Sequence, residues 1–129
     1  MRLLLDTHVF LWLAGSPSKL SVAATDAIAD RANDVFISAA VTWEIVLKYP
    51  SGKLRLPTSP ASYVPSRIAA FGFSSLPITQ DHAIAVASLP ATHTDPFDRI
   101  MIAQAQVEGL TFVTRDAASL TYPVNTIEA

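Results

Sequence analysis

The chain has 129 residues, of which half are apolar and 16% are charged, and this composition predicts one globular domain and excludes a disordered chain. It has no cysteine, which excludes disulfides and thiolate metal sites and is typical of a reducing cytoplasm. The formal net charge is −2, so a polyanion would have to be bound by a local basic patch or through metal ions.

Short apolar runs alternate with amphipathic stretches along the chain. Buried strands are predicted at residues 2–5, 35–37 and 110–114, with weaker strands at 73–78 and 122–127. Helices are predicted after Thr7 and over residues 22–32, 39–48, 59–71 (interrupted at Pro65), 79–89 and 96–108. This alternation predicts a parallel sheet covered by helices on both faces, and ligands of such sheets bind beyond the carboxyl ends of the strands.

None of the apolar runs reaches the roughly 20 residues that a membrane span needs. The first run, residues 2–5, is followed directly by Asp6 and is also too short for a signal peptide. We therefore expect no membrane association.

Two carboxylates open the helix that is predicted to begin at Pro96. Asp95 is the expected N-cap, since proline suits the first helical position. Asp98 lies three residues later, about one turn away, so both side chains can face the same way. A capping box normally carries Glu or Gln at that later position, so capping alone does not explain the second aspartate.

Three further acids are expected at the same edge of the sheet. Asp6 directly follows the first strand, and Asp116 lies two residues beyond the strand at 110–114. Glu44 lies about two turns into the helix that leaves the second strand, among apolar neighbours that favour an inward position. Carboxylates without cysteine predict a site for Mg²⁺ or Mn²⁺. Such an ion could activate water, and phosphodiester hydrolysis is the chemistry that fits best.

Five short motifs resemble those of PIN-domain ribonucleases, and more narrowly those of the VapC-type toxins of bacterial type II toxin–antitoxin pairs. They are Leu3-Leu4-Leu5-Asp6-Thr7-His8, Thr42-Trp43-Glu44-Ile45, Gly52-Lys53-Leu54, His93-Thr94-Asp95-Pro96-Phe97-Asp98-Arg99 with Ile102-Ala103-Gln104-Ala105, and Thr114-Arg115-Asp116. The resemblance implies a three-layer α/β/α sandwich with a central, mostly parallel five-stranded sheet. It also implies an Mg²⁺- or Mn²⁺-dependent endoribonuclease that forms a homodimer and, with a VapB-like antitoxin, a heterotetramer or larger assembly. DNA would be contacted only through the antitoxin.

The resemblance carries over to single positions. Asp6, Glu44 and Asp116 match the first, second and last acids of the family's metal site. The third acid has two candidates, Asp98 and Asp95, of which Asp98 is slightly favoured. The pair Tyr49-Pro50 departs from the family pattern, because relatives usually continue this helix toward the Gly-Lys-Leu turn.

Other polar residues are predicted around the acids. Thr7 and Thr114 are expected to hydrogen-bond the metal-binding carboxylates. Arg99 and Arg115 are expected either as counter-ions of the acids or as contacts to RNA phosphate or to an acidic tail of a partner. His93 is expected in a structural role in its loop, where it would support the metal-binding acids or contact RNA phosphate, and is less favoured as a metal ligand.

More distant residues receive simpler interpretations. His82 is expected on the surface, and the basic residues Lys48, Lys53 and Arg55 are expected on a solvated face. The apolar residues 9–13 and 63–73 are candidates for dimer or antitoxin contact, although an ordinary core could absorb several of them.

Two rival functions fit the residues less well. A phosphoacceptor receiver domain would need an acidic pair after the first strand and a lysine after a late strand, but the chain has Thr7-His8 and Arg115 there. A catalytically silent PIN-fold module, whose pocket only stabilises the structure, is the second rival. The presence of all the expected acids argues against it.

Overall fold

The computed structural model describes residues 1–91 and 93–129, and its centre is one parallel sheet. The strands are β1 (Arg2–Leu5), β2 (Asp34–Ser38), β3 (Ser74–Leu76), β4 (Thr111–Thr114) and β5 (Thr126–Glu128), in the order β3-β2-β1-β4-β5. The helices are α1 (Thr7–Gly15), α2 (Val22–Ala29), α3 (Ala39–Lys48), α4 (Pro60–Phe71), α5 (Gln80–Ala85) and α6 (Pro96–Glu108).

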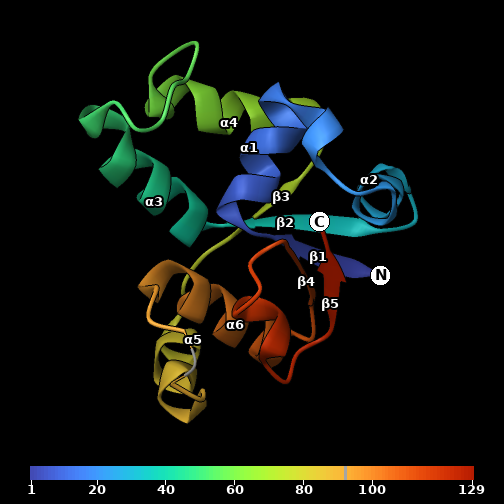
Figure 1. Cartoon of the computed structure of the whole chain (residues 1–129), viewed down its shortest axis with the longest axis vertical. Coiled ribbons are helices and arrows are strands. Elements are labelled where there is room, and N and C mark those ends of the chain that lie inside the picture. The colour runs from blue at the N-terminus through green and yellow to red at the C-terminus, as the bar shows by residue number, and fades with distance from the viewer. Residues whose placement is uncertain (92) are drawn as a thin grey trace.

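Helices cover both faces of the sheet, as predicted. Figure 1 shows α1 and α4 on one side of the strands and α5 and α6 on the other, which makes a three-layer α/β/α sandwich. All four strand pairings are parallel. Within residues 1–91 and 93–129, no helix is both long enough and apolar enough to cross a membrane.

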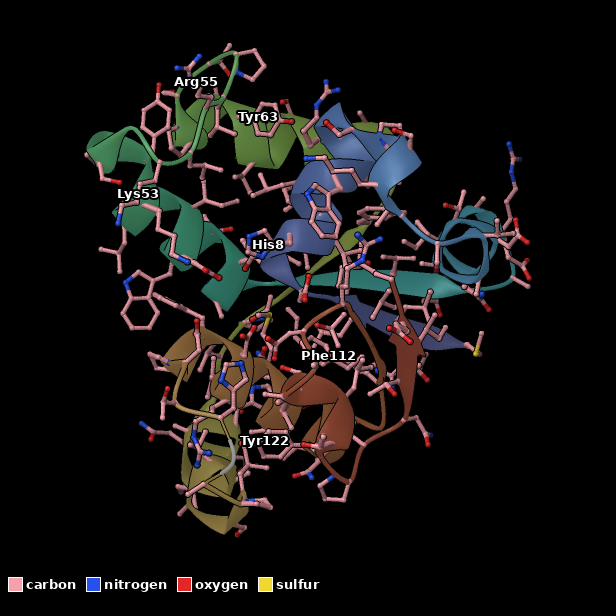
Figure 2. The ribbon with its side chains drawn as sticks, in the orientation of Figure 1. His8, Lys53, Arg55, Tyr63, Phe112 and Tyr122 are labelled. Atoms are coloured by element: carbon pink, nitrogen blue, oxygen red, sulfur yellow. The ribbon has the colours of Figure 1, made fainter. Side chains whose placement is uncertain are left out.

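The central strand β1 fixes the position of the candidate site. Its three leucines are fully buried, with Leu3 paired to Val35 of β2 and to Thr111 of β4. The fully buried Phe112 of β4 is labelled in Figure 2. Because the strands are parallel, β1, β2 and β4 end at the same edge of the sheet, where the backbone N–H of Asp6 donates to the Val113 carbonyl at 3.1 Å.

Some helix boundaries differ from the prediction. The N-cap of α1 is Asp6 and not Thr7, because the Asp6 carboxylate accepts the backbone N–H of Val9. Helix α4 continues through Pro65 without interruption. Tyr63 and Val64 are buried on its inner face, and this packing outweighs the roughly 3 kcal/mol that an interior proline costs a helix.

Two helices are shorter than predicted. Helix α2 ends at Ala29 instead of Ala32, because Asp30 has an extended backbone and its side chain accepts the N–H of Ala32. Helix α5 ends at Ala85, and a 3₁₀ turn (Val86–Ser88) follows it. After Lys48, at the Tyr49-Pro50 pair, the chain forms a short 3₁₀ turn.

The prediction that His82 lies on the surface is wrong. The ring is fully buried between α5 and α6, with its Nε2 atom 2.7 Å from a carboxylate oxygen of Glu108. Its Nδ1 atom accepts the backbone N–H of Thr79 at 3.0 Å, while the Thr79 hydroxyl accepts the backbone N–H of His82. The histidine therefore takes the place that Glu or Gln fills in an ordinary capping box.

The apolar segments expected at a contact surface pack largely into the core. Val9 and Phe10 are fully buried, and most of the remaining apolar side chains of residues 9–13 and 63–73 are buried or packed against the core. Three exposed apolar side chains lie together on α3, where Trp43, Val46 and Leu47 are each about half exposed. The sequence did not show this, because the three side chains occupy the face of α3 opposite the buried Glu44 and Ile45.

Candidate active site at the carboxyl edge of the sheet

A cavity of about 350 Å³ opens where β1 and β4 end, and its lining is acidic. The acids come from four points of the fold: the turn after β1, α3, the start of α6, which supplies two of them, and the loop after β4. The five predicted acids all line it: Asp6, Glu44, Asp95, Asp98 and Asp116.

Asp6 is buried at the base of this cavity. One of its carboxylate oxygens accepts the backbone N–H of Val9 at 2.9 Å, and the other accepts the hydroxyl of Thr114. Burial raises the pKa of Asp6, although the hydrogen bonds from Thr114 and Val9 act in the opposite direction. The Thr114 oxygen also accepts the backbone N–H of Asp116 at 3.1 Å, so this threonine holds two of the acids in place.

Glu44 projects inward from α3 and is also buried. The Thr7 hydroxyl donates to one of its oxygens at 2.5 Å, and the Lys48 ammonium forms an ion pair with the other. The hydrogen bond to Glu44 raises the pKa of Lys48, so the lysine stays charged. Both glutamate oxygens therefore have a partner within the protein.

His93 lines the cavity and contacts two of its acids. Its Nε2 atom lies 2.9 Å from a carboxylate oxygen of Asp98 and 2.9 Å from one of Asp116. Its Nδ1 atom accepts the backbone N–H of Asp95, which assigns the ring proton to Nε2 in the neutral tautomer. The nitrogen and the two oxygens lie within 4.8 Å of one another.

The two carboxylates of this cluster differ in their electrostatics. Burial raises the pKa of Asp98 to about 7, and the nearby charges of Asp95 and Asp6 add to the effect. Burial also acts on Asp116, but hydrogen bonds from Ser119 and the proximity of His93 outweigh it and lower the pKa of Asp116. The site thus contains one carboxylate that is ionised throughout the neutral range and one that gains a proton near pH 7.

The structure gives Asp95 and Asp98 different roles. The Asp95 carboxylate accepts the backbone N–H groups of Phe97 at 2.8 Å and of Asp98 at 3.2 Å, so it caps α6. The Asp98 carboxylate points to His93 instead. Sequence spacing left both acids as candidates, and the side-chain directions distinguish them.

The Asp95→Ala variant is expected to lower the free energy of unfolding by about 0.5–2 kcal/mol, because two backbone N–H groups at the start of α6 lose their acceptor. Asp95→Asn should cost much less, since asparagine caps helices as well as aspartate does. Urea unfolding of the metal-free protein would measure both. Equal stability of the alanine variant and the original chain would contradict the capping role.

Arg99 and Arg115 are not counter-ions of the acids. The Arg99 guanidinium donates to backbone carbonyls, including those of Pro90 at 2.7 Å and His93 at 3.2 Å. The Arg115 guanidinium donates to the carbonyl of Ala129 and lies 4.6 Å from the centre of the Trp12 ring. Within the described ranges neither forms an ion pair with a carboxylate, and both tie loops together around the site.

Tyr122 is a residue of this region that the sequence did not reveal. Its hydroxyl accepts the backbone N–H of His93 at 2.9 Å and donates to the Pro90 carbonyl at 2.9 Å, so it holds the loop that carries His93. Arg99 also donates to this oxygen. These partners are 23–32 residues away along the chain, and no local pattern marks such contacts.

The Tyr122→Phe variant is expected to lose about 1–3 kcal/mol of stability, because the His93 N–H and the Pro90 carbonyl are left without this partner. Urea unfolding would measure the loss. The matched control is Tyr63→Phe, since the Tyr63 hydroxyl makes no hydrogen bond to a described residue. A similar loss in both variants would contradict the anchoring role.

The chemistry of the donor set fits a hard divalent cation. The cluster offers two carboxylate oxygens and one imidazole nitrogen, and further carboxylates line the same cavity. Neighbouring negative charges already raise the pKa of Asp98, and a bound cation would relieve that repulsion. Mg²⁺ and Mn²⁺ prefer oxygen ligands of this kind.

Comparisons with known proteins agree with this geometry. The sequence pattern of the PIN domain matches residues 3–121. Ribonuclease VapC22 of Mycobacterium tuberculosis is 30% identical over 114 residues, which cover 88% of this chain and 85% of that protein. Ribonuclease VapC16 of the same organism is 45% identical over 56 residues, which cover 43% of this chain and 38% of that protein.

The fold also matches a solved structure. The crystal structure of DNA-bound VapBC from Salmonella typhimurium superposes with a TM-score of 0.74 and 18% identity, and the match covers 99% of this chain and 98% of that one. The family pattern covers most of the chain, and the relative that is 30% identical is matched over most of its length. The chain belongs to the PIN-domain family and, within it, to the VapC-type proteins.

Proposed function

We propose that this chain is an Mg²⁺- or Mn²⁺-dependent endoribonuclease that hydrolyses RNA phosphodiester bonds as the toxin of a bacterial type II toxin–antitoxin pair. The observation that carries the proposal is the convergence of Asp98, Asp116 and Asp6 on one cavity at the carboxyl edge of the sheet. The names of two relatives, both ribonucleases, support the reaction class.

The metal-binding roles fall to acids that the fold holds in place. Asp6, Asp98 and Asp116 are the proposed ligands, with Glu44 beside them. A bound divalent ion supplies an activated water and charge compensation at the phosphate. Thr114 orients the Asp6 carboxylate and the backbone of Asp116, and Asp95 orients the first turn of α6.

The chain's own residues also prepare the pocket for an anionic substrate. Burial of Asp6 and Glu44 limits how far water can compete for their oxygens. The Lys48 ammonium, which pairs with Glu44, and the Arg115 guanidinium place positive charge among the acids that line the cavity. His93 holds Asp98 and Asp116 together through a single N–H.

The proposed partners are a VapB-like antitoxin and a second copy of the chain, in a heterotetramer or larger assembly in the cytoplasm. The VapBC complex from Salmonella typhimurium supports the antitoxin. The exposed apolar side chains of Trp43, Val46 and Leu47 on α3 support a self-association surface. DNA would be reached only through the antitoxin, since the chain has a net charge of −2.

The proposal is tested by incubating the purified chain with single-stranded RNA in Mg²⁺ or Mn²⁺, in EDTA, and with the Asp6→Asn variant. We expect cleavage only by the unmodified chain with the metal. Equal cleavage in all three samples would overturn the proposal. Metal binding that raises the melting temperature without any cleavage would favour the catalytically silent module instead.

A further inference from the structure

A second cavity, which we call the basic groove, lies between α1, α4 and the segment 53–58. Its volume is about 770 Å³, and no aspartate or glutamate is among its described lining residues. Figure 2 shows Lys53, Arg55 and Tyr63 on the side of α1 that faces α3 and α4, where His8 also lies. Four cations line it: Lys19, Lys53, Arg55 and Arg67.

The basic groove is continuous with the acidic cavity. His8 and Trp12 line both of them. A third cavity of about 340 Å³ joins the two, and its lining includes Glu44 from the acidic side and Lys53 from the basic side. A ligand in the groove would therefore extend directly to the acids.

The two cavities differ in charge: five carboxylates line the acidic cavity, and four lysines and arginines line the basic groove. The chain has nine lysines and arginines, so the groove holds nearly half of them, although the net charge is −2. Arg99 and Arg115 are used by backbone carbonyls, whereas Lys53, Arg55 and Arg67 form no ion pair with any described residue. This charge is not needed to hold the described parts of the fold together, and it favours a polyanionic ligand.

A single-stranded nucleic acid fits the groove better than other anions. Proteins bind such strands with cations along the backbone and flat side chains against the bases. The rings of His8 and Trp12 lie 5.7 Å apart at the junction with the acidic cavity and supply such surfaces. The acids repel the phosphodiesters that flank the one held at a bound ion, so cations outside the acidic cavity would add an attachment for the rest of the strand.

We propose that the basic groove binds the backbone of a single-stranded RNA and leads it to the acidic cavity. The proposal rests on the function proposed above only in taking RNA as the substrate. An acidic peptide has a similar charge, but a phosphodiester also accounts for the direct continuity with the acids.

The test measures RNA binding separately from cleavage. The full chain carrying Asp98→Asn is titrated, in EDTA, into a fluorescent single-stranded RNA of about 12 nucleotides, within the range that single-stranded sites span. Binding is followed by anisotropy at several salt concentrations, for that chain alone and with Lys53→Ala, Arg55→Ala or both added. The matched control is Arg31→Ala, an exposed arginine that lines a separate cavity.

Each lost phosphate contact should make the plot of log affinity against log salt shallower by about 0.7, so the double variant should lose about 1.4. The control should leave the slope unchanged. Equal slopes in all variants would overturn the proposal. Loss of affinity for a poly-glutamate peptide, with RNA binding unchanged, would also overturn it and assign the groove to a peptide.

The outcome is separable from that of the proposed function. If the slopes change but the unmodified chain does not cleave RNA with Mn²⁺, the groove is supported and the nuclease proposal fails. If the unmodified chain cleaves RNA but the slopes do not change, the groove proposal fails and the nuclease proposal stands.

Discussion

The Asp98→Asn variant is expected to bind Mn²⁺ at least about 100-fold more weakly than the unmodified chain. Substitution of residues that merely support metal ligands costs 10–100-fold in affinity, so loss of a direct carboxylate ligand should reach or exceed the upper value. Calorimetric titration would measure the loss. RNA cleavage at a fixed, subsaturating Mn²⁺ concentration should fall in parallel, because the proposed reaction needs the ion.

The structure predicts that this variant still folds. Asparagine has nearly the same shape as aspartate, and its side-chain oxygen can accept the N–H of His93 as the carboxylate does. The Asp95 cap is untouched, because it receives the backbone N–H of residue 98 and not the side chain. If Asp98→Asn lowers the metal affinity without lowering the free energy of unfolding, the lost affinity can be assigned to the missing carboxylate ligand.

Asp95→Asn is the matched control, one turn away in the same cavity. We expect its Mn²⁺ affinity to stay within a few-fold of the original, since the Asp95 Oδ1 atom accepts the backbone N–H groups of Phe97 and Asp98 and so directs the side chain to the start of α6. Equal weakening in the two variants would mean that Asp95 is also a ligand. Weakening in Asp95→Asn alone would reverse the assignment of the third acid.

The sheet was predictable because local sequence decides it. The apolar run at residues 3–5 has no helical period, and it becomes the fully buried central strand. The placement of Asp6 and Asp116 follows from the same argument, because parallel strands end at one edge. Both acids line the cavity as predicted.

The contacts between side chains were not predictable in the same way. The sequence suggests that His93 supports the acids or contacts RNA, but it does not show which acids the ring joins, and Nε2 lies 2.9 Å from both Asp98 and Asp116. Arg99 follows Asp98 directly in sequence, but its guanidinium points to backbone carbonyls on the other side of the loop. The direction of these side chains depends on packing against residues far away in the sequence, here Tyr122. The spacing of residues along the chain does not show such contacts.

The sequence does not show which cations gather on one surface. Lys53 and Arg55 are expected on a solvated face, and both are exposed. The fold places them beside Lys19 and Arg67, which are far away along the chain. The basic groove is lined by α1, α4 and the segment between α3 and α4, which are separate in the sequence.

Mg²⁺ affinity should depend strongly on pH below neutrality. The pKa of Asp98 is raised to about 7 by burial and by neighbouring acids, so below that pH the ion must displace a proton. Displacement of one proton predicts that the apparent affinity falls about tenfold for each pH unit below 7. Asp116, whose pKa is lowered, adds little to this dependence in the same range.

The stability of the metal-free protein should change in the opposite direction. Because the folded state holds the Asp98 proton more tightly than the unfolded state does, the free energy of unfolding should fall as pH rises from about 4 to about 7. The raised pKa of Asp6 has the same sign. Saturating Mg²⁺ should reverse the trend, since the bound ion stabilises the ionised carboxylates.

Urea unfolding at several pH values between about 5 and about 8, with and without Mg²⁺, would measure both effects. The difference between the unmodified chain and Asp98→Asn isolates the contribution of Asp98, because the asparagine does not titrate. That difference should shrink or change sign on adding Mg²⁺, because only the aspartate gains a favourable cation. A difference that is independent of pH and of Mg²⁺ would show that Asp98 is ionised throughout this range and is not a ligand. Burial and the neighbouring acids raise the pKa of Asp98, and the same neighbouring acids favour a bound cation, so the pH dependence of stability and that of metal affinity should report on the same carboxylate.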